Sequence, residues 1–216
     1  MTALGDLSTV PPDFLAALAS LRRAQGRSEV RLEEIPAPAR LAPFAVALSA
    51  EVFEPAASFA RPQHGPAAAA LADARAGEDD DELATGRFIL LHDPAGSAVW
   101  KGNFRIVTYI RAQLDADMGN DAMLGSVAWT WLVEALQDHS ARHTQAGGTA
   151  TRVLSESFGG LSDRPETIDI ELRASWTPSD PDVTNHLEAW MDMVCTFAGL
   201  PPLPAGVTAL PRRRRS

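Results

Sequence analysis

Glu156 is the acidic side chain of this sequence that most clearly needs a partner. Residues 151–158 alternate in a way that predicts a strand, and Glu156 points to the same side as its apolar neighbours. A carboxylate in such surroundings requires a cation or a hydrogen-bond donor. Arg152 or Arg173 on a neighbouring strand would supply one, so we expect a cross-strand ion pair. The alternative is a Glu/Arg pair that anchors a small ligand, with His92 contributing to the same site.

The other polar groups of this region do not complete a catalytic set. Ser155 and Ser157 share the opposite side of the strand, without a Gly-x-Ser-x-Gly elbow or an ordered Ser/His/Asp set around them. The pairs Gly147-Gly148 and Gly159-Gly160 neither precede Lys-Ser/Thr nor open a helix after a strand. We predict turn glycines instead of phosphate loops. The sequence therefore leans away from an enzyme and indicates no catalytic residue and no cofactor.

His139 and His143 have the spacing of two metal ligands on one helix face, with Asp138 beside them. No Glu lies between them, no Cys is near, and the helix is predicted to end at His139, so we expect a solvated helix end. The acidic run 78–82 lacks the alternation of a calcium loop and is predicted to be a solvating charge run. We therefore predict no metal site.

The chain has five tryptophans but a single tyrosine. Trp131, Trp176 and Trp190 fall on the inward faces of predicted elements and are expected in the core. Trp129 lies beside the apolar stripe of its helix and Trp100 follows a turn, so these two are candidates for an exposed contact patch. The alternative is that both are packed, as most tryptophans are.

The C-terminal run Arg212, Arg213, Arg214, Arg215 is the one strongly basic segment of a chain whose formal net charge is −9. Such a tail can bind nucleic acid, an acidic partner or the acidic run of this chain, or it can be an unstructured solubilising end. The acidic balance argues against a broad phosphate-binding surface. We therefore do not expect the body of the protein to bind nucleic acid.

Cysteine content and hydropathy exclude further classes. Cys195 is the single cysteine, which excludes an internal disulfide and multi-cysteine metal sites. The first ten residues lack a basic segment followed by an apolar run, and no stretch approaches eighteen uninterrupted apolar residues. We expect a cytoplasmic protein that does not associate with membranes.

Periodicity predicts the elements that would position these side chains. Helical spacing marks residues 11–25, 123–139 and 181–198, the last with Asp180 as N-cap and Gly199 after its end. Alternation and short apolar runs mark strands at 29–35, 44–52, 88–91, 99–110, 151–158 and 167–176, with a hairpin turn at 93–96. We expect a disordered N-terminus at 1–10, a single domain at 11–204 with a flexible Ala/Pro/acidic insertion at 55–85, and a flexible basic tail at 205–216.

The order of these elements indicates the fold class. Strand pairs joined by short turns, with helices between the pairs, predict an α+β protein with a largely antiparallel sheet covered by helices. The predicted order is α-β-β-(insertion)-β-β-α-β-β-α.

Four segments carry a resemblance to a known family: RLEEIPAPARLAPFAVALSAEV (Arg31 to Val52), DELATGRFILLHDPAGSAVWKGNFRIVTYIRA (Asp81 to Ala112), SESFGGL (Ser155 to Leu161) and RASWTP (Arg173 to Pro178). Across residues 11–204 the chain resembles the actinobacterial family catalogued as Domain of Unknown Function 3000. The resemblance implies a bacterial cytoplasmic protein without assigned activity, cofactor or catalytic residues. The element order separately resembles the type III secretion chaperone-like fold, whose members bind other polypeptides and often dimerise.

Three functional hypotheses follow. The first is a non-enzymatic protein-binding or chaperone-like module that holds an unidentified protein on an exposed sheet face or a tryptophan-bearing surface, with a homodimer left open. The second is an enzyme or small-ligand sensor with its site near Glu156, Arg173, Arg152 and His92. The third is a nucleic-acid accessory protein that acts through the arginine tail.

Overall fold

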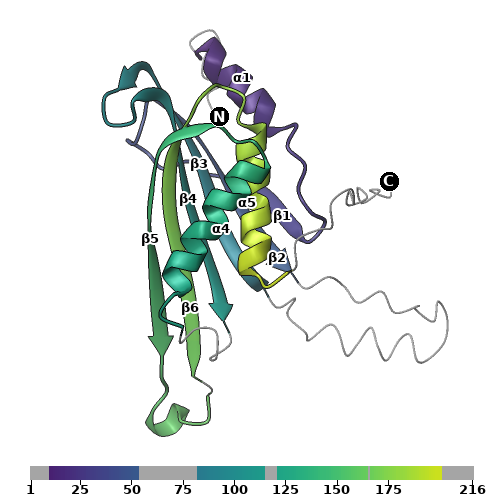
Figure 1. Ribbon diagram of the computed structural model, residues 1–216, viewed down its shortest axis with the longest axis vertical. Coiled ribbons are helices and arrows are strands. Elements are labelled where there is room, and N and C mark those ends of the chain that lie inside the picture. The colour runs from purple at the N-terminus through teal and green to yellow at the C-terminus, as the bar shows by residue number, and fades with distance from the viewer. Residues whose placement is uncertain (1–9, 54–81, 115–120, 165, 201–216) are drawn as a thin grey trace, which may run out of the picture.

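One antiparallel sheet organises the protein, and its helices cover one face of that sheet (Figure 1). The computed structural model describes residues 10–53, 82–114, 121–164 and 166–200. The elements are α1 (Pro12–Leu21), β1 (Val30–Ile35), β2 (Phe44–Phe53), β3 (Glu82–Ser97), β4 (Gly102–Leu114), α4 (Leu124–Asp138), β5 (His143–Ser155), the 3-10 turn η2 (Gly159–Leu161), β6 (Thr167–Pro178) and α5 (Thr184–Phe197). The strands lie in the order β1-β2-β3-β4-β6-β5. The predicted fold class and element order are confirmed.

Strand β4 shows how the sequence divides the two faces of the sheet. Its even-numbered residues from Phe104 to Ile110 are buried beneath the helices. Its odd-numbered residues from Arg105 to Arg111 point to the face that the helices leave open. Side chains alternate along a strand, and residues paired across two strands point to the same face. The register of β4 with β3 and β6 therefore shows which side chains of those strands point to each face. The sheet therefore has an apolar face under the helices and a mixed polar face on the other side.

Helix α5 fills the middle of the covered face. Leu187, Trp190 and Val194 are fully buried on it. The Trp190 ring packs against Phe88, with ring centroids 5.5 Å apart. It also lies directly over Gly86, where an added Cβ would come within 2.6 Å of the ring. The glycine lets the helix approach the sheet closely at this point.

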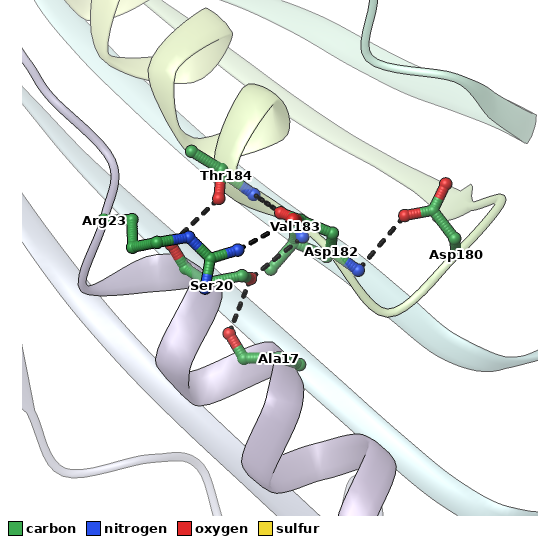
Figure 2. Close-up of polar contacts among 7 residues, drawn as sticks. All are labelled: Ala17, Ser20, Arg23, Asp180, Asp182, Val183 and Thr184. Carbon is green, nitrogen blue, oxygen red and sulfur yellow. Dashed lines mark hydrogen bonds and ion pairs between the residues drawn. The ribbon is translucent and has the colours of Figure 1, made fainter.

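The end of α1 caps the start of α5 (Figure 2). The Ser20 hydroxyl donates to the Ala17 carbonyl at 2.7 Å and accepts from the Val183 amide at 2.9 Å. The Thr184 hydroxyl donates to the Ser20 carbonyl at 3.0 Å, and the Asp182 carboxylate accepts from the Thr184 amide at 3.1 Å. These bonds satisfy backbone groups that a helix terminus leaves unpaired. They hold α1 against α5.

The N-terminus of α5 differs from the sequence prediction. Asp180 was expected to cap a helix beginning at Pro181, but α5 begins at Thr184. Asp180 instead accepts a hydrogen bond from the amide of Asp182 at 3.1 Å, which shapes the turn before the helix. The prediction was wrong because the capping group of α1 is distant in sequence and leaves no local signal.

The hairpin between β3 and β4 also differs. The turn lies at residues 98–101, where Lys101 has a φ of 55°, and not at the predicted 93–96. Residues 93–96 belong to β3 and interrupt its register with β4, with Gly96 at a φ of 77°. A bulge and a turn both favour Asp, Pro and Gly, so local composition does not distinguish them.

Two further boundaries are corrected. β3 begins at Glu82, so residues 82–85 are strand and not part of the expected flexible insertion. The remainder of that insertion lies outside the described residues. β5 begins at His143, so Gly147 and Gly148 are strand residues and not turn glycines. The strand prediction missed them because it depends on alternating apolar and polar side chains, and a run of glycine and alanine shows no such alternation.

His186 is a buried histidine of α5. Its ring is 3% exposed, and its Nδ1 accepts a hydrogen bond from the indole nitrogen of Trp176 at 3.1 Å. Burial lowers the pKa of His186 to about 4, and the nearby imidazole of His143 acts in the same direction. The folded protein therefore holds this ring neutral at pH values where an exposed histidine is protonated.

None of the described helices combines the length and the apolar character needed to cross a membrane.

The capping bond predicts an effect of Ser20→Ala. Removing this hydroxyl leaves the buried Val183 amide unpaired, which should lower the free energy of unfolding by about 1–3 kcal/mol. The matched control is Ser126→Ala, because Ser126 makes the same bond to the carbonyl three residues before it on an exposed face of α4. It should change stability by less than about 0.5 kcal/mol. Urea denaturation measures both, and equal effects would contradict the capping role.

The two adjacent glycines of β5 are predicted to respond differently to substitution by alanine. A Cβ at Gly148 would meet the Arg173 carbonyl oxygen at 2.6 Å and the Trp129 ring at 2.9 Å, whereas at Gly147 no atom lies within 4 Å. Gly148→Ala should cost about 1–3 kcal/mol of stability. Gly147→Ala should stay within about 0.5 kcal/mol of the native protein. Thermal or urea unfolding distinguishes them, and a Gly148→Ala protein of native stability would show that Trp129 does not pack there.

His186 predicts acid sensitivity. The unfolded chain takes up this proton near a pKa of 6.5 and the folded protein near 4, so stability falls as pH drops through this window. The advantage of native protein over His186→Gln should shrink by about 2 kcal/mol between about pH 7 and pH 4.5. His139, whose pKa is raised by its hydrogen bond to Asp192, titrates in the opposite sense but is present in both proteins. A pH-independent difference in urea denaturation would refute the assignment.

Candidate binding face

The face of the sheet opposite the helices is hollowed. The hollow has a volume of about 990 Å³ and is lined by side chains of all strands from β2 to β6. The twist of an antiparallel sheet curves its surface, and the helices cover the other side only (Figure 1). We call this surface the concave face, defined by the lining side chains of β2 to β6. Its floor is backbone held by the ladder and is therefore rigid.

A row of side chains crosses the concave face at mid-height. The register places Ser49, Arg87, Tyr109, Arg173 and Thr149 side by side on five adjacent strands. Neighbouring residues in such a row have Cβ atoms about 4.5–5.5 Å apart. The row thus places two guanidinium groups, one phenol and two hydroxyls next to one another across the sheet.

The rows on either side differ from each other in character. Ile89 and Val107 occupy the row toward the β3–β4 hairpin and make it apolar. Glu51 and Arg111 occupy the row toward the other end and make it charged. The concave face therefore changes from apolar to charged along the strand direction.

Two of the three arginines that line the hollow form ion pairs with neighbouring carboxylates. Arg111 contacts Asp169 at 2.9 Å, and Arg173 contacts Glu171 at 2.9 Å. The side chain of Arg87 is exposed, and it makes no hydrogen bond or ion pair with any of the described residues. Arg87 is thus the lining cation whose charge remains available to a ligand.

Tyr109 stands at the centre of the row. Desolvation raises its pKa, and a hydrogen bond with Glu171 acts in the same direction, so its hydroxyl stays neutral. The guanidinium carbon of Arg173 lies 5.6 Å from the ring centroid. Arg173 is therefore held both by Glu171 and by the ring. The phenol offers an apolar ring and a polar tip to a bound group.

The β3–β4 hairpin lies beyond one end of the concave face and is bonded to the strand next to it. Thr177 points to this face, and its hydroxyl donates to the backbone carbonyl of Trp100 at 2.6 Å. Arg105 binds the hydroxyls of Ser175 and Thr177 and the carbonyl of Gln145. The hairpin end therefore bends over the sheet, and the Arg105 bonds tie β4 to β6 and β5 beneath it.

The two candidate tryptophans lie in different places. Trp100 is half-buried in the hairpin turn, where its carbonyl accepts the bond from Thr177. Trp129 is half-buried on α4, on the opposite side of the sheet, with its ring close to Gly148. The structure does not bring them into one patch.

The four residues of the predicted Glu/Arg site are also separated. Arg173 points to the concave face, whereas Arg152 lies on the helix side, where it donates to the Asp121 carbonyl at 2.8 Å. Glu156 follows the end of β5, seven positions beyond the residue that pairs with Arg173, which is on the order of 20 Å along a strand. His92 is buried among phenylalanines.

The two histidines with metal-ligand spacing do not face each other across a helix. His139 follows the last residue of α4 and binds Asp192 at 2.7 Å, whereas His143 begins β5 and its Nδ1 lies 2.8 Å from the Ala141 carbonyl. Within the described ranges no three His, Cys, Asp or Glu side chains are placed to hold a metal ion. Residues 78–81 of the acidic run and the tail Arg212–Arg215 lie outside the described residues.

Sequence reasoning did not single out Arg87 or Tyr109. The signal was present in β4, where the residues between the buried positions are Arg105, Val107, Tyr109 and Arg111. Alternation shows that such residues share a face. It does not show that the face is hollow or which arginines are already paired.

The comparisons with known proteins give a family but no function. No curated protein and no solved structure matches the chain. The model of one family, described as Protein of unknown function (DUF3000), matches residues 10–208. The matched region includes every described helix and strand and the whole concave face. The chain therefore belongs to the DUF3000 family.

Proposed function

We propose that the protein is a non-enzymatic binding module that holds an extended, acidic segment of another polypeptide on its concave face. The observation that carries the proposal is the exposed Arg87 side chain, which has no partner in the described part of the chain and lies beside Tyr109 in the middle of a hollow. An anionic side chain placed there gains a charge-assisted hydrogen bond, because Arg87 gives up no existing ion pair among the described residues.

The dimensions of the face support a polypeptide ligand. Neighbouring strands lie about 4.8 Å apart, so the row from Ser49 to Thr149 spans about 19 Å. An extended peptide covers that distance with about six residues. Small-molecule pockets enclose most of their ligand, whereas this surface is a shallow, open hollow across five strands.

The lining chemistry supports a segment that carries both an acidic and an apolar side chain. Arg87 would bind the carboxylate, and Ile89 beside it on β3 would contact the apolar group together with Val107. The phenol of Tyr109 and the hydroxyls of Ser49 and Thr149 suit backbone amides and carbonyls. The likeness of the element order to secretion chaperones agrees with this proposal but stays a prediction.

Selection of binders from a random twelve-residue peptide library tests the proposal. We expect enriched peptides that contain Asp or Glu near an apolar residue. Arg87→Glu should weaken them at least about tenfold, the loss expected for one charge-assisted bond. Arg22→Glu is the matched control, because it changes the net charge equally at an exposed arginine of the α1 end. It should leave affinity within about twofold.

Photo-crosslinking locates the bound peptide. A photoreactive phenylalanine analogue at Thr149 should link to the selected peptide, whereas the same group at Thr130, which is exposed on α4, should not. Equal linking at the two positions would contradict the assigned face. Selection of basic peptides, or preferential binding of single-stranded RNA over every peptide, would contradict the assigned ligand.

A further inference from the structure

The two edges of the sheet are unlike each other. β1 has six residues, three of them charged, and Pro36 and Pro38 follow it closely. Short length, charge and proline are the devices by which natural sheets prevent pairing with another chain. β5 at the other edge has thirteen residues and contains no proline, lysine or acidic residue. β5 does contain one irregularity, a register shift with β6 between Thr144 and Gly147, where Gln145 has a φ of 54°. From Gly147 to Ser155 it pairs with β6 without interruption and carries a single charge, that of Arg152.

The outer side of β5 is open. It pairs with β6 on one side, and none of the described helices or strands lies along its other side (Figure 1). Along such an edge, alternate backbone N–H and C=O groups point away from the sheet and lack ladder partners. Most side chains from Thr144 to Ser155 are exposed as well. The regular part of β5, from Gly147 to Ser155, therefore presents a template for one more strand.

Apolar side chains gather at one end of this edge. Val153 is 40% exposed and Leu154 53% exposed, on opposite sides of the strand. The end of β5 before them is small, with Ala146 and Gly147, and the space above Gly147 is empty. Bulky residues near one end and small residues near the other make the strand complementary to an antiparallel copy of itself.

We propose that two copies of the chain associate by antiparallel pairing of their β5 edges, about a two-fold axis at Ala150. In this register Val153 of each copy lies opposite Gly147 of the other, within the regular part of the strand. A two-fold axis makes the contact self-complementary and closed, so it produces a dimer and not a filament.

Charge favours a second copy at this edge. The chain carries a formal net charge of −9, so two copies repel each other over most of their surfaces. The β5 strand has no carboxylate, and its Arg152 falls opposite Gly148 in the proposed register, away from the other arginine. The edge is therefore a place where two such acidic chains can meet without like charges opposed.

The pairing would join the two sheets into one and place both concave faces on the same side. Gly147 and Thr149 belong to β5 and line the hollow, so the second strand would extend its wall. This inference rests on the edge strand and not on the proposed ligand, so either can fail without the other.

Sedimentation velocity over about 1 µM to 1 mM tests the association. We expect the native protein to move from one chain to two with rising concentration. The double variant Val153→Lys/Leu154→Lys adds charge at two exposed positions and should raise the dimer dissociation constant at least about tenfold. Leu15→Lys is the control, because Leu15 is 43% exposed on α1, and it should not alter the constant. A native protein that stays monomeric, or a dimer insensitive to the double variant, overturns the proposal.

Disulfide trapping tests the register. Cys195 is buried and burial raises its pKa to about 12, so an introduced cysteine is the reactive one. Ala150→Cys should form a covalent dimer under mild oxidation, because the two copies of residue 150 face each other. Gly147→Cys and Val153→Cys should each fail alone but link when mixed. Linking by each single variant alone, or by none of the three, contradicts this register.

Discussion

The helices cover only one face of the sheet, so every strand has to satisfy two environments at once. This one-sided burial is the constraint on which the rest of the structure depends. It requires apolar side chains at alternate positions beneath α4 and α5, and it leaves the positions between them free of packing. In β4 the buried series includes Ile106 and Ile110, and the free series includes Tyr109. The concave face exists because the second series is not required for the core.

Helix α5 converts the apolar face into a core. Its close approach depends on Gly86 beneath Trp190, and its first turn depends on Ser20 of α1, which lies far away in sequence. At the end of α4, His139 is paired with Asp192 of α5. On this covered side the buried indole nitrogen of Trp190 and Nε2 of His92 have no hydrogen-bond partner among the described residues. The binding surfaces that we propose lie on the open side and at the β5 edge.

On the open side, the arginines differ in whether their charge is already paired with another group of the protein. Asp169 and Glu171 neutralise Arg111 and Arg173, and Arg105 is occupied by hydroxyls and a carbonyl. Arg87 differs from these side chains in having no partner among the described residues. The family assignment agrees with this picture by covering all of these elements, although it carries no activity.

The sequence by itself determined the elements and their faces, because periodicity of 3.6 or 2 is a property of neighbouring residues. Helix α4 and strand β6 were found within a few residues of their true ends. The sequence did not determine the start of α5, the position of the hairpin turn or the strand character of Gly147 and Gly148. Each of these depends on a distant group: Ser20 for the helix, the β4 ladder for the hairpin, and β6 for the glycines. The same reason separates Glu156 from Arg173 and leaves the Arg87 side chain without a partner among the residues that the structure describes. Side-chain pairing across strands is decided by register and curvature, which only the tertiary structure supplies.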